Sequence, residues 1–147
     1  MNTSIDTLLE GKGRALHAVP VTVTVYEAVE AMNRHRIGAM LVMDGPKLAG
    51  IFTERDALTR VISASLDPKV TPVSMVMSAN VLTIAPETTV QQVMDIFAER
   101  RCRHLPVIQN DTLVGLVSIG DVSRWVANSH RAEAESLRQY IAGGLST

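Results

Sequence analysis

Apolar side chains recur with a helical period at two separate places in the chain. Each group has the i, i+3, i+4, i+7 spacing that places its members on one face of an α-helix. The members are Val25, Ala28, Val29 and Met32 in the first group, and Val90, Val93, Met94 and Phe97 in the second. Thr24 and Thr89 precede the groups, and Glu27 and Gln92 follow at the spacing of a capping box. The pattern predicts two amphipathic helices with matching N-termini.

Two short apolar runs follow each predicted helix. The runs cover residues 39–43 and 48–52 in the first half and residues 105–108 and 113–117 in the second half. Asp44-Gly45-Pro46 and Asn110-Asp111 separate the runs, and such residues favour tight turns. Each pair of runs therefore predicts a β-hairpin. A shorter strand is expected before each helix, near Ala18–Pro20 and near Leu82–Ile84.

The two halves form an internal repeat, because residues 19–62 align with residues 84–127. Each unit follows the order β-α-β-β-α, and a unit of this size cannot bury a good core alone. We therefore expect an α+β fold in which two repeats, residues 5–62 and 73–127, pack face to face around a pseudo-two-fold axis. The whole chain, residues 1–147, would form this single module.

Segments outside the repeat also carry apolar positions. A small amphipathic turn precedes each unit, with Ile5, Leu8 and Leu9 in the first and Val73, Val76 and Met77 in the second. After the second unit, one apolar stripe consists of Ala134, Leu137 and Ile141. This stripe predicts a C-terminal helix over residues 128–142, and we expect Gly143-Gly144 to end it.

Composition excludes several classes of protein. The 147 residues carry a net charge of −1 and five aromatic side chains, which gives no support for binding nucleic acid or an anionic membrane. The single cysteine, Cys102, excludes an internal disulfide and a multi-cysteine metal site. The longest apolar run, residues 37–43, is too short to span a bilayer, and the polar N-terminus lacks a signal-peptide pattern. We expect a cytoplasmic protein without membrane contact.

Four stretches together resemble the tandem cystathionine β-synthase (CBS) domain pair, also called a Bateman module. They are Ile37-Gly38-Ala39, Gly50-Ile51-Phe52-Thr53-Glu54-Arg55-Asp56, Arg101-Cys102-Arg103-His104-Leu105-Pro106-Val107 and Gly115-Leu116-Val117-Ser118-Ile119-Gly120-Asp121. The resemblance implies a regulatory module that binds an adenosyl ligand. AMP or NAD(H) is expected first, and ATP, ADP and S-adenosylmethionine are further candidates. It also implies a flat homodimer, and an effector protein that the sequence does not identify.

Asp56 and Asp121 end matching Thr/Ser-x-x-Asp motifs at the start of a predicted helix. Thr53 and Ser118 can cap that helix, which explains the motif without any ligand. A helix N-terminus after a strand also suits a nucleotide, and in the resembled family this aspartate holds the ribose. Both roles can hold together. Of the two aspartates we favour Asp121, because Gly120 beside it leaves the backbone accessible.

Basic residues near the same motifs are candidates for phosphate contacts. Arg103 and His104 follow the second predicted helix, Arg36 follows the first, and Arg55 lies beside Asp56. Solvated helix C-termini explain part of this cluster equally well. Lys12, in Gly11-Lys12-Gly13-Arg14, can reach a phosphate as a flap, although a flexible turn also explains that segment. Adenine is expected against Val19, Ala39, Ile84 and Pro106, with Ile37, Gly38, Leu105 and Ile119 as further lining residues.

Two other functions stay open, namely a ligand-free dimerisation module and a small nucleotide hydrolase. Catalytic patterns are poor, since residues 115–120 miss the Gly-x-Ser-x-Gly motif by one position and the four histidines are scattered. Cys102 lies among arginines that can lower a thiol pKa, yet a packed cysteine at a strand entry is favoured. We predict no enzyme activity, no catalytic cofactor and no metal. Surplus apolar helix faces predict a homodimer.

Overall fold

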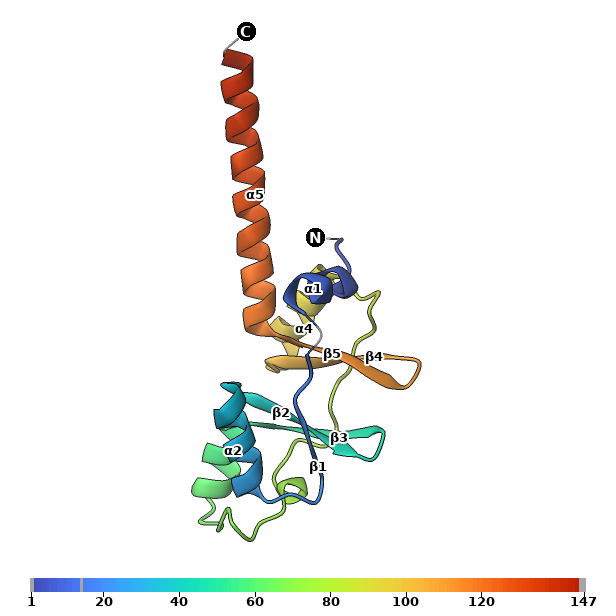
Figure 1. The fold of residues 1–147 in the computed structure, drawn as a ribbon, viewed down its shortest axis with the longest axis vertical. Helices are drawn as coiled ribbons and strands as arrows, with labels where there is room; N and C mark the ends of the chain where they lie inside the picture. Colours follow the sequence, from blue (N-terminus) through green and yellow to red (C-terminus); the bar gives the residue numbers. More distant parts are fainter. Residues whose placement is uncertain (1, 14, 146–147) are drawn as a thin grey trace.

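The chain folds into two stacked α+β halves, from which one long helix projects (Figure 1). The computed structural model describes residues 2–13 and 15–145, and side chains as far as Gln139. The elements of the first half are β1 (Ala18–Pro20), α2 (Val25–His35), β2 (Ala39–Asp44), β3 (Lys47–Thr53), α3 (Glu54–Asp56) and the π-helical turn Ala57–Ile62. Those of the second are α4 (Val90–Arg100), β4 (His104–Gln109), β5 (Thr112–Ser118) and α5 (Ile119–Leu145). The α+β class with two repeats is confirmed.

The two amphipathic helices begin and end in the same way. Thr24 Oγ1 accepts from the Glu27 N–H at 3.2 Å, and Thr89 Oγ1 accepts from the Gln92 N–H at 3.1 Å. The side chains at the third helical position return a bond to each threonine N–H, so both capping boxes are complete. Both helices stop where an arginine, Arg36 or Arg101, takes a left-handed conformation. Local sequence therefore sets the N-terminal ends of α2 and α4, whereas arginine has no local preference for the left-handed conformation that ends them.

The two sheets differ in their first strand. In the first half β1 pairs with β2 in parallel, and β2 pairs with β3 antiparallel. In the second half β4 and β5 form the same hairpin, but the strand expected at Leu82–Ile84 is wrong. Only Ile84 makes a bridge there, to Val107, because the chain turns immediately afterwards between Ala85 and Thr88. The second sheet therefore has two strands and one isolated bridge.

Each half completes its core with a segment from outside its own β-α-β-β-α unit. Helix α1 (Ile5–Lys12) packs onto the second core, and the Val90 N–H donates to Thr3 O at 2.8 Å. The short 3₁₀ helix Val73–Met75 packs onto the first core, and the Val73 N–H donates to Val23 O at 2.9 Å. These two segments, residues 5–12 and 73–80, are called the leaders below. Each leader precedes one repeat in the sequence and packs onto the other repeat.

A third apolar layer joins the two sheets. Its buried members are Ala39, Leu41 and Ile51 of the first half, and Leu113 and Leu116 of the second half pack against them. The predicted face-to-face packing of the repeats places these residues in contact. Two equivalent glycines allow the leaders to approach the sheets closely. A Cβ on Gly50 would lie 2.6 Å from Ser78 O, and one on Gly115 would lie 2.6 Å from Leu9 Cδ1.

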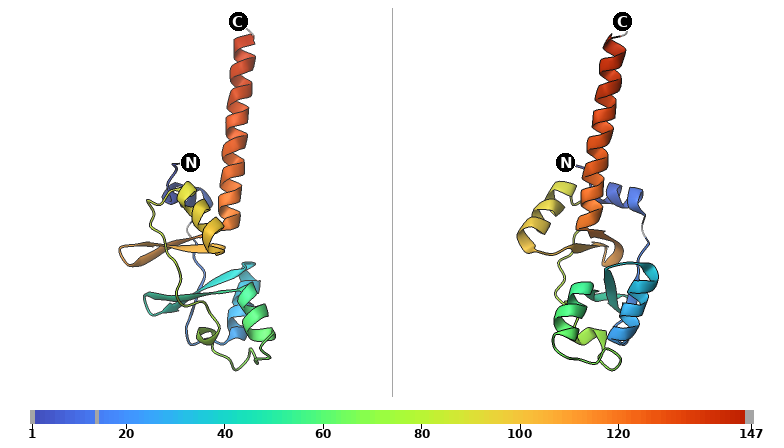
Figure 2. Two further views of the ribbon diagram at one scale, coloured as in Figure 1. Left: turned by 180° about the vertical axis from the view of Figure 1, so that it is seen from behind. Right: turned by 90° about the vertical axis from the view of Figure 1, so that its left-hand side faces the viewer.

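Helix α5 is one continuous helix over Ile119–Leu145, and it extends beyond both halves in every view (Figure 2). Val122, Trp125 and Val126 attach its first turns to the second core. The predicted C-terminal helix over residues 128–142 is confirmed as the continuation of α5, but the prediction that Gly143-Gly144 ends it is wrong. A glycine costs a helix only about 1 kcal/mol relative to alanine, so two glycines near the end do not stop it. Within the described residues, no helix combines the length and apolar character needed to cross a membrane.

Candidate functional site

A cleft of about 780 Å³ lies between the two halves, beside the start of α3. The first half contributes the loop before β2 and the strand-to-helix junction after β3. The second half contributes the segment that joins α4 to β4, and the chain between the halves closes one side. The lining residues are Gly38, Ile51, Thr53, Glu54, Arg55, Asp56, Ser78, Asn80, Val81, Leu82, Arg100, Arg101, Cys102, Arg103, His104 and Leu105.

Asp56 is the buried carboxylate among the residues that line this cleft. Its Oδ2 accepts from the Thr53 N–H at 3.0 Å, and its own N–H donates to Thr53 Oγ1 at 3.2 Å. The capping interpretation is thereby correct for Asp56. Among the described residues, the cation that pairs with Oδ1 is Arg60, whose Nε lies at 3.7 Å, too far for a hydrogen bond. One carboxylate oxygen therefore keeps the capacity to accept from a ligand hydroxyl.

Basic side chains from both halves surround the same cleft. Arg55 comes from α3, and Arg100, Arg101 and Arg103 come from the end of α4 and the loop after it. All four arginines are exposed, so their guanidinium groups stay hydrated and can pair with an anion. Glu54 and Asp56 are the acidic residues in the lining. The charge of the cleft mouth therefore favours a phosphate-bearing ligand.

His104 lies at the first residue of β4, on the boundary between the cleft and the second half. Burial lowers the pKa of His104, Lys12 and Arg103 lower it further, and Asp121 and Glu54 oppose them. The imidazole is therefore predominantly neutral near pH 7. A phosphate placed beside it would favour the protonated form, which donates from both ring nitrogens.

The equivalent carboxylate of the second repeat, Asp121, already accepts hydrogen bonds from side chains and backbone of the protein. Lys12 Nζ donates to its Oδ2 at 2.5 Å and to Leu116 O at 2.6 Å. Arg124 Nη2 donates to Oδ1 at 2.6 Å, and the Ser118 N–H donates to Oδ2 at 2.8 Å. Burial alone would raise the pKa of Asp121, but the bonds from Lys12 and Ser118 outweigh it and lower the pKa. Both oxygens are therefore committed to cations.

The structure brings together seven of the residues expected in the site. They are Gly38, Thr53, Arg55, Asp56, Arg103, His104 and Leu105. Lys12, Ser118 and Asp121 form the separate ion cluster of the second repeat, at the start of α5 next to Ile119 and Gly120. Ala39, Pro106 and Ile84 are buried, and Val19 and Ile37 pack against the first core. Arg36 is exposed at the end of α2, and Arg14 lies outside the described residues.

Some lining residues have no signal in the sequence. Ser78, Asn80, Val81 and Leu82 come from the chain between the repeats, and they reach the cleft because Ser78 bridges Ile51 at the edge of β3. That pairing is long-range, and no local pattern indicates it. Glu54 could have been identified from the sequence, because it lies inside the Thr53–Asp56 motif. In the structure its N–H donates to Gly38 O at 3.0 Å.

Cys102 also lines the cleft, and its surroundings favour the packed interpretation. Burial raises the pKa of the Cys102 thiol, although Arg100 partly opposes this effect. A thiol with a raised pKa is a poor nucleophile at neutral pH. The residue packs against the second core.

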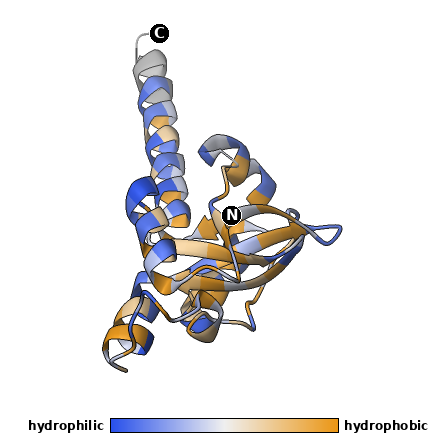
Figure 3. Ribbon diagram, turned by 60° about the horizontal axis from the view of Figure 1, so that its bottom comes forward, coloured by the Kyte–Doolittle hydropathy of each residue, from blue (hydrophilic) through white to orange (hydrophobic). Residues whose placement is uncertain are grey.

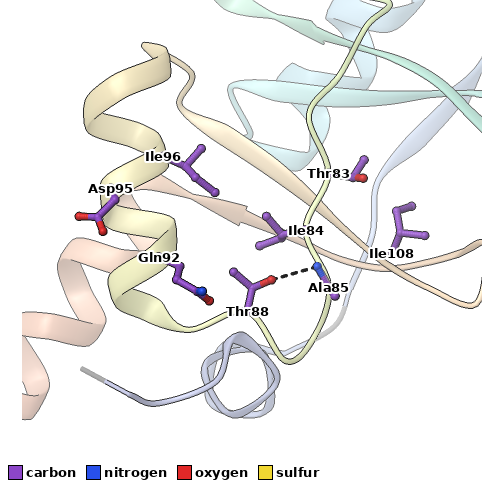
Figure 4. A pocket seen from close by; sticks show the side chains of 8 residues that line it. All are labelled: Thr83, Ile84, Ala85, Thr88, Gln92, Asp95, Ile96 and Ile108. Carbon is purple, nitrogen blue, oxygen red and sulfur yellow. Dashed lines mark hydrogen bonds between the residues drawn. The ribbon is translucent and has the colours of Figure 1, made fainter.

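A second hollow, of about 670 Å³, lies between α4 and the chain before it (Figure 4). Ile84, Ile96 and Ile108 provide apolar surface, and Thr88 Oγ1 accepts from the Ala85 N–H at 3.2 Å. Among the residues that line it, the charged side chain is acidic, Asp95. This hollow does not suit a phosphate, so the basic cleft is the candidate site.

A family model described as CBS domain matches this chain twice, over residues 13–63 and residues 73–128. The CBS domain-containing protein CBSX3, mitochondrial, from Arabidopsis thaliana is 38% identical over 152 residues, covering 97% of this chain and 74% of the relative. That name describes the relative, so a cytoplasmic location stays a prediction for this chain.

Solved structures of similar proteins have the same fold. The CBS-domain containing protein ATU1752 from Agrobacterium tumefaciens has a TM-score of 0.79 and 37% identity, covering 83% of this chain and 98% of that one. The CBS domain protein PAE2072 from Pyrobaculum aerophilum, complexed with AMP, has a TM-score of 0.71 and 23% identity, covering 80% and 88%. At that identity, the second likeness shows the fold alone.

Proposed function

Because the chain belongs to the CBS domain family, we propose that its inter-repeat cleft binds an adenine nucleotide and that the module regulates rather than catalyses. One observation carries this proposal. The cleft places the Asp56 carboxylate, which can accept from ribose hydroxyls, beside four exposed arginines and His104. These groups come from both repeats. A nucleotide presents hydroxyl groups and phosphates together, which matches that combination of an acceptor and cations.

The expected ligands are AMP or NAD(H), with ATP, ADP and S-adenosylmethionine as further candidates. Ribose hydroxyls would donate to Asp56 Oδ1, and phosphates would pair with Arg55, Arg103 and protonated His104. The apolar part of the lining, Ile51, Val81 and Leu82, offers surface for the adenine ring. The bound AMP of the Pyrobaculum aerophilum protein supports this class of ligand.

Regulation would follow from the position of the cleft between two repeats. A ligand that touches both halves can favour one relative arrangement over another, and it shifts the equilibrium by its difference in affinity for the two. An effector protein would then recognise the favoured arrangement. We include a homodimer in the proposal, because Leu58 and Ile62 of the first half are 59% and 67% exposed.

Native mass spectrometry of freshly purified protein, followed by thermal-shift measurements, tests the proposal. The panel contains AMP, ADP, ATP, NAD, NADH and S-adenosylmethionine, with GTP as the control for nucleotide base. A ligand at 100 times its dissociation constant adds about 2.7 kcal/mol of stability. We expect at least one adenosyl ligand to shift the midpoint and GTP to shift it much less.

The same samples separate the proposal from the other two functions. If no ligand of the panel shifts the midpoint and the purified protein carries no nucleotide, the dimerisation module is favoured and the proposal fails. If ATP or NAD is converted to products at a rate above the buffer blank, the hydrolase is favoured. Product formation is followed by chromatography of the nucleotides after incubation.

A further inference from the structure

Helix α5 continues far beyond the body of the molecule, and nothing in the described chain covers its outer part. Its 27 residues correspond to about 40 Å, while its apolar attachment to the second core ends at Val126. Every side chain from Arg131 to Gln139 is exposed. Most helices in proteins are stabilised by packing an amphipathic face rather than by intrinsic propensity. The projecting part, residues 127–145, is called the arm below.

The arm carries a seam with the spacing of a coiled coil. Ala127, His130, Ala134 and Leu137 are separated alternately by three and four residues, and the sequence continues the spacing with Ile141. Leu137 is 59% exposed, and the other three described side chains are also exposed. Hydrophobic and hydrophilic positions alternate along the helix in Figure 3. In heptad terms, Ala127 and Ala134 are a positions, and His130 and Leu137 are d positions.

The charges beside this seam favour a second copy of the same chain as the partner, in parallel orientation. Arg131 and Arg138 occupy e positions, and Glu133 occupies a g position. In a parallel pair, a g residue faces the e residue five positions later on the other helix, so Glu133 would meet the partner's Arg138 twice by symmetry. In an antiparallel pair, e faces e and g faces g, which would place like charges together. The pattern is therefore self-complementary only for a parallel pair.

We propose that the arm pairs in parallel with the arm of a second copy of this chain, along the seam Ala127, His130, Ala134 and Leu137. The small residues at the a positions allow the two helices to approach closely. This inference does not depend on nucleotide binding, and it gives the proposed homodimer a defined interface.

Cysteine cross-linking in the full-length protein tests the direction of pairing. With Cys102→Ala as background, Ala127→Cys and Ala134→Cys are made separately and oxidised with glutathione disulfide. In a parallel pair each cysteine meets its own copy, so both variants should form disulfide-linked dimers. Ala132→Cys, on the opposite face of the same helix, is the matched control and should stay largely monomeric on a non-reducing gel.

The cross-linking pattern distinguishes parallel pairing from the alternatives. An antiparallel pair can bring only one of the two seam positions close to its own copy, so a dimer from one variant alone overturns the proposed direction. If neither variant cross-links more than Ala132→Cys, the arm does not pair with itself. Sedimentation equilibrium then shows whether a dimer exists through another surface, and nucleotide titration is unaffected by either result.

Charge reversal gives an independent readout. Glu133→Arg removes two attractive pairs and creates two repulsive ones, so the dimer should dissociate about tenfold more readily. Adding Arg138→Glu to the same chain should restore the dimer. Glu135→Arg makes the same change of charge outside the positions that flank the seam and should leave the dissociation constant unchanged. Equal effects of Glu133→Arg and Glu135→Arg would overturn the proposed register.

Discussion

Asp56 and Asp121 occupy equivalent positions in the two repeats, yet their carboxylates are in different chemical situations. Both complete the same capping box, with Thr53 in one case and Ser118 in the other. Asp121 also accepts from Lys12 and Arg124 at 2.5 and 2.6 Å, whereas Arg60 Nε lies 3.7 Å from Asp56. Equivalent motifs therefore do not imply equivalent sites.

The difference arises from residues outside the motif. Lys12 ends the leader that packs onto the second repeat, and Asn80, at the matching place in the other leader, has no charge to offer. Arg60 of the first half directs a guanidinium nitrogen to Met77 O at 3.1 Å rather than to Asp56. One repeat uses a cation to neutralise its aspartate, and the other uses a cation to hold its leader.

The largest expected effect is on ligand affinity, and it should differ between substitutions of the two aspartates. Asp56→Asn should weaken binding of the nucleotide identified in the screen by about 10- to 150-fold, because a hydrogen bond to a charged acceptor contributes roughly 1.5–3 kcal/mol. Its unfolding free energy should change little, since Asn keeps a capping oxygen. Calorimetric titration measures the affinity. Asp121→Asn is the matched control, and an equal loss in both variants would contradict the assignment to Asp56.

The next effect concerns stability and its dependence on pH. Asp121→Asn should lower the unfolding free energy by about 1–2 kcal/mol at pH 7, because Lys12 and Arg124 lose their charged partner. The pKa of Asp121 is lowered in the folded protein, so its contribution is present above the unfolded value of about 3.9 and is lost as pH falls through the folded value. Urea unfolding across the acid range should show wild type and variant converging. A constant difference would contradict the ionic explanation.

A smaller effect is expected from removing the charge that the leader brings to the second repeat. Lys12→Met removes the ammonium group and keeps an unbranched side chain of similar length. Lys12 is 35% exposed, so the lost ion pair should cost only about 1 kcal/mol of unfolding free energy. Urea midpoints measure it. Lys47→Met, at the exposed start of β3, is the control, and an equal loss there would show that lysine removal itself is responsible.

The smallest effect concerns His104, which lies between the two sites. A phosphate beside it would favour protonation, so nucleotide binding should tighten by about threefold as pH falls from about 7.5 to about 5.5. The groups that set its pKa are Asp121, Lys12, Arg103 and Glu54, and burial is the largest cause of the lowered value. His104→Gln should flatten the trend. His35→Gln, outside the cleft, should keep it, and an unchanged trend in His104→Gln would remove His104 from the site.

Sequence patterns predicted the features that short stretches of chain determine. The capping boxes at Thr24 and Thr89, both hairpins and the repeat itself depend on residues close together, and each is present in the structure. The preference for Asp121 over Asp56 as the ligand contact came from its neighbour Gly120. The bond that disfavours it joins Lys12 to a residue 109 positions away. No local pattern contains such a contact, nor the one between Ser78 and Ile51 that closes the cleft.

The exchange of leaders between the repeats has a consequence for how the chain is made. During synthesis, the first repeat cannot close its core until Val73 and Val76 have left the ribosome. Helix α1, although it is made first, must wait for Val90 and Leu105 before it has a surface to cover. A fragment that ends between the repeats would expose Ile5, Leu8 and Leu9 and lack part of its own core. We therefore expect the pair to be the smallest unit that folds, and a repeat expressed alone to need the other repeat's leader to complete its core.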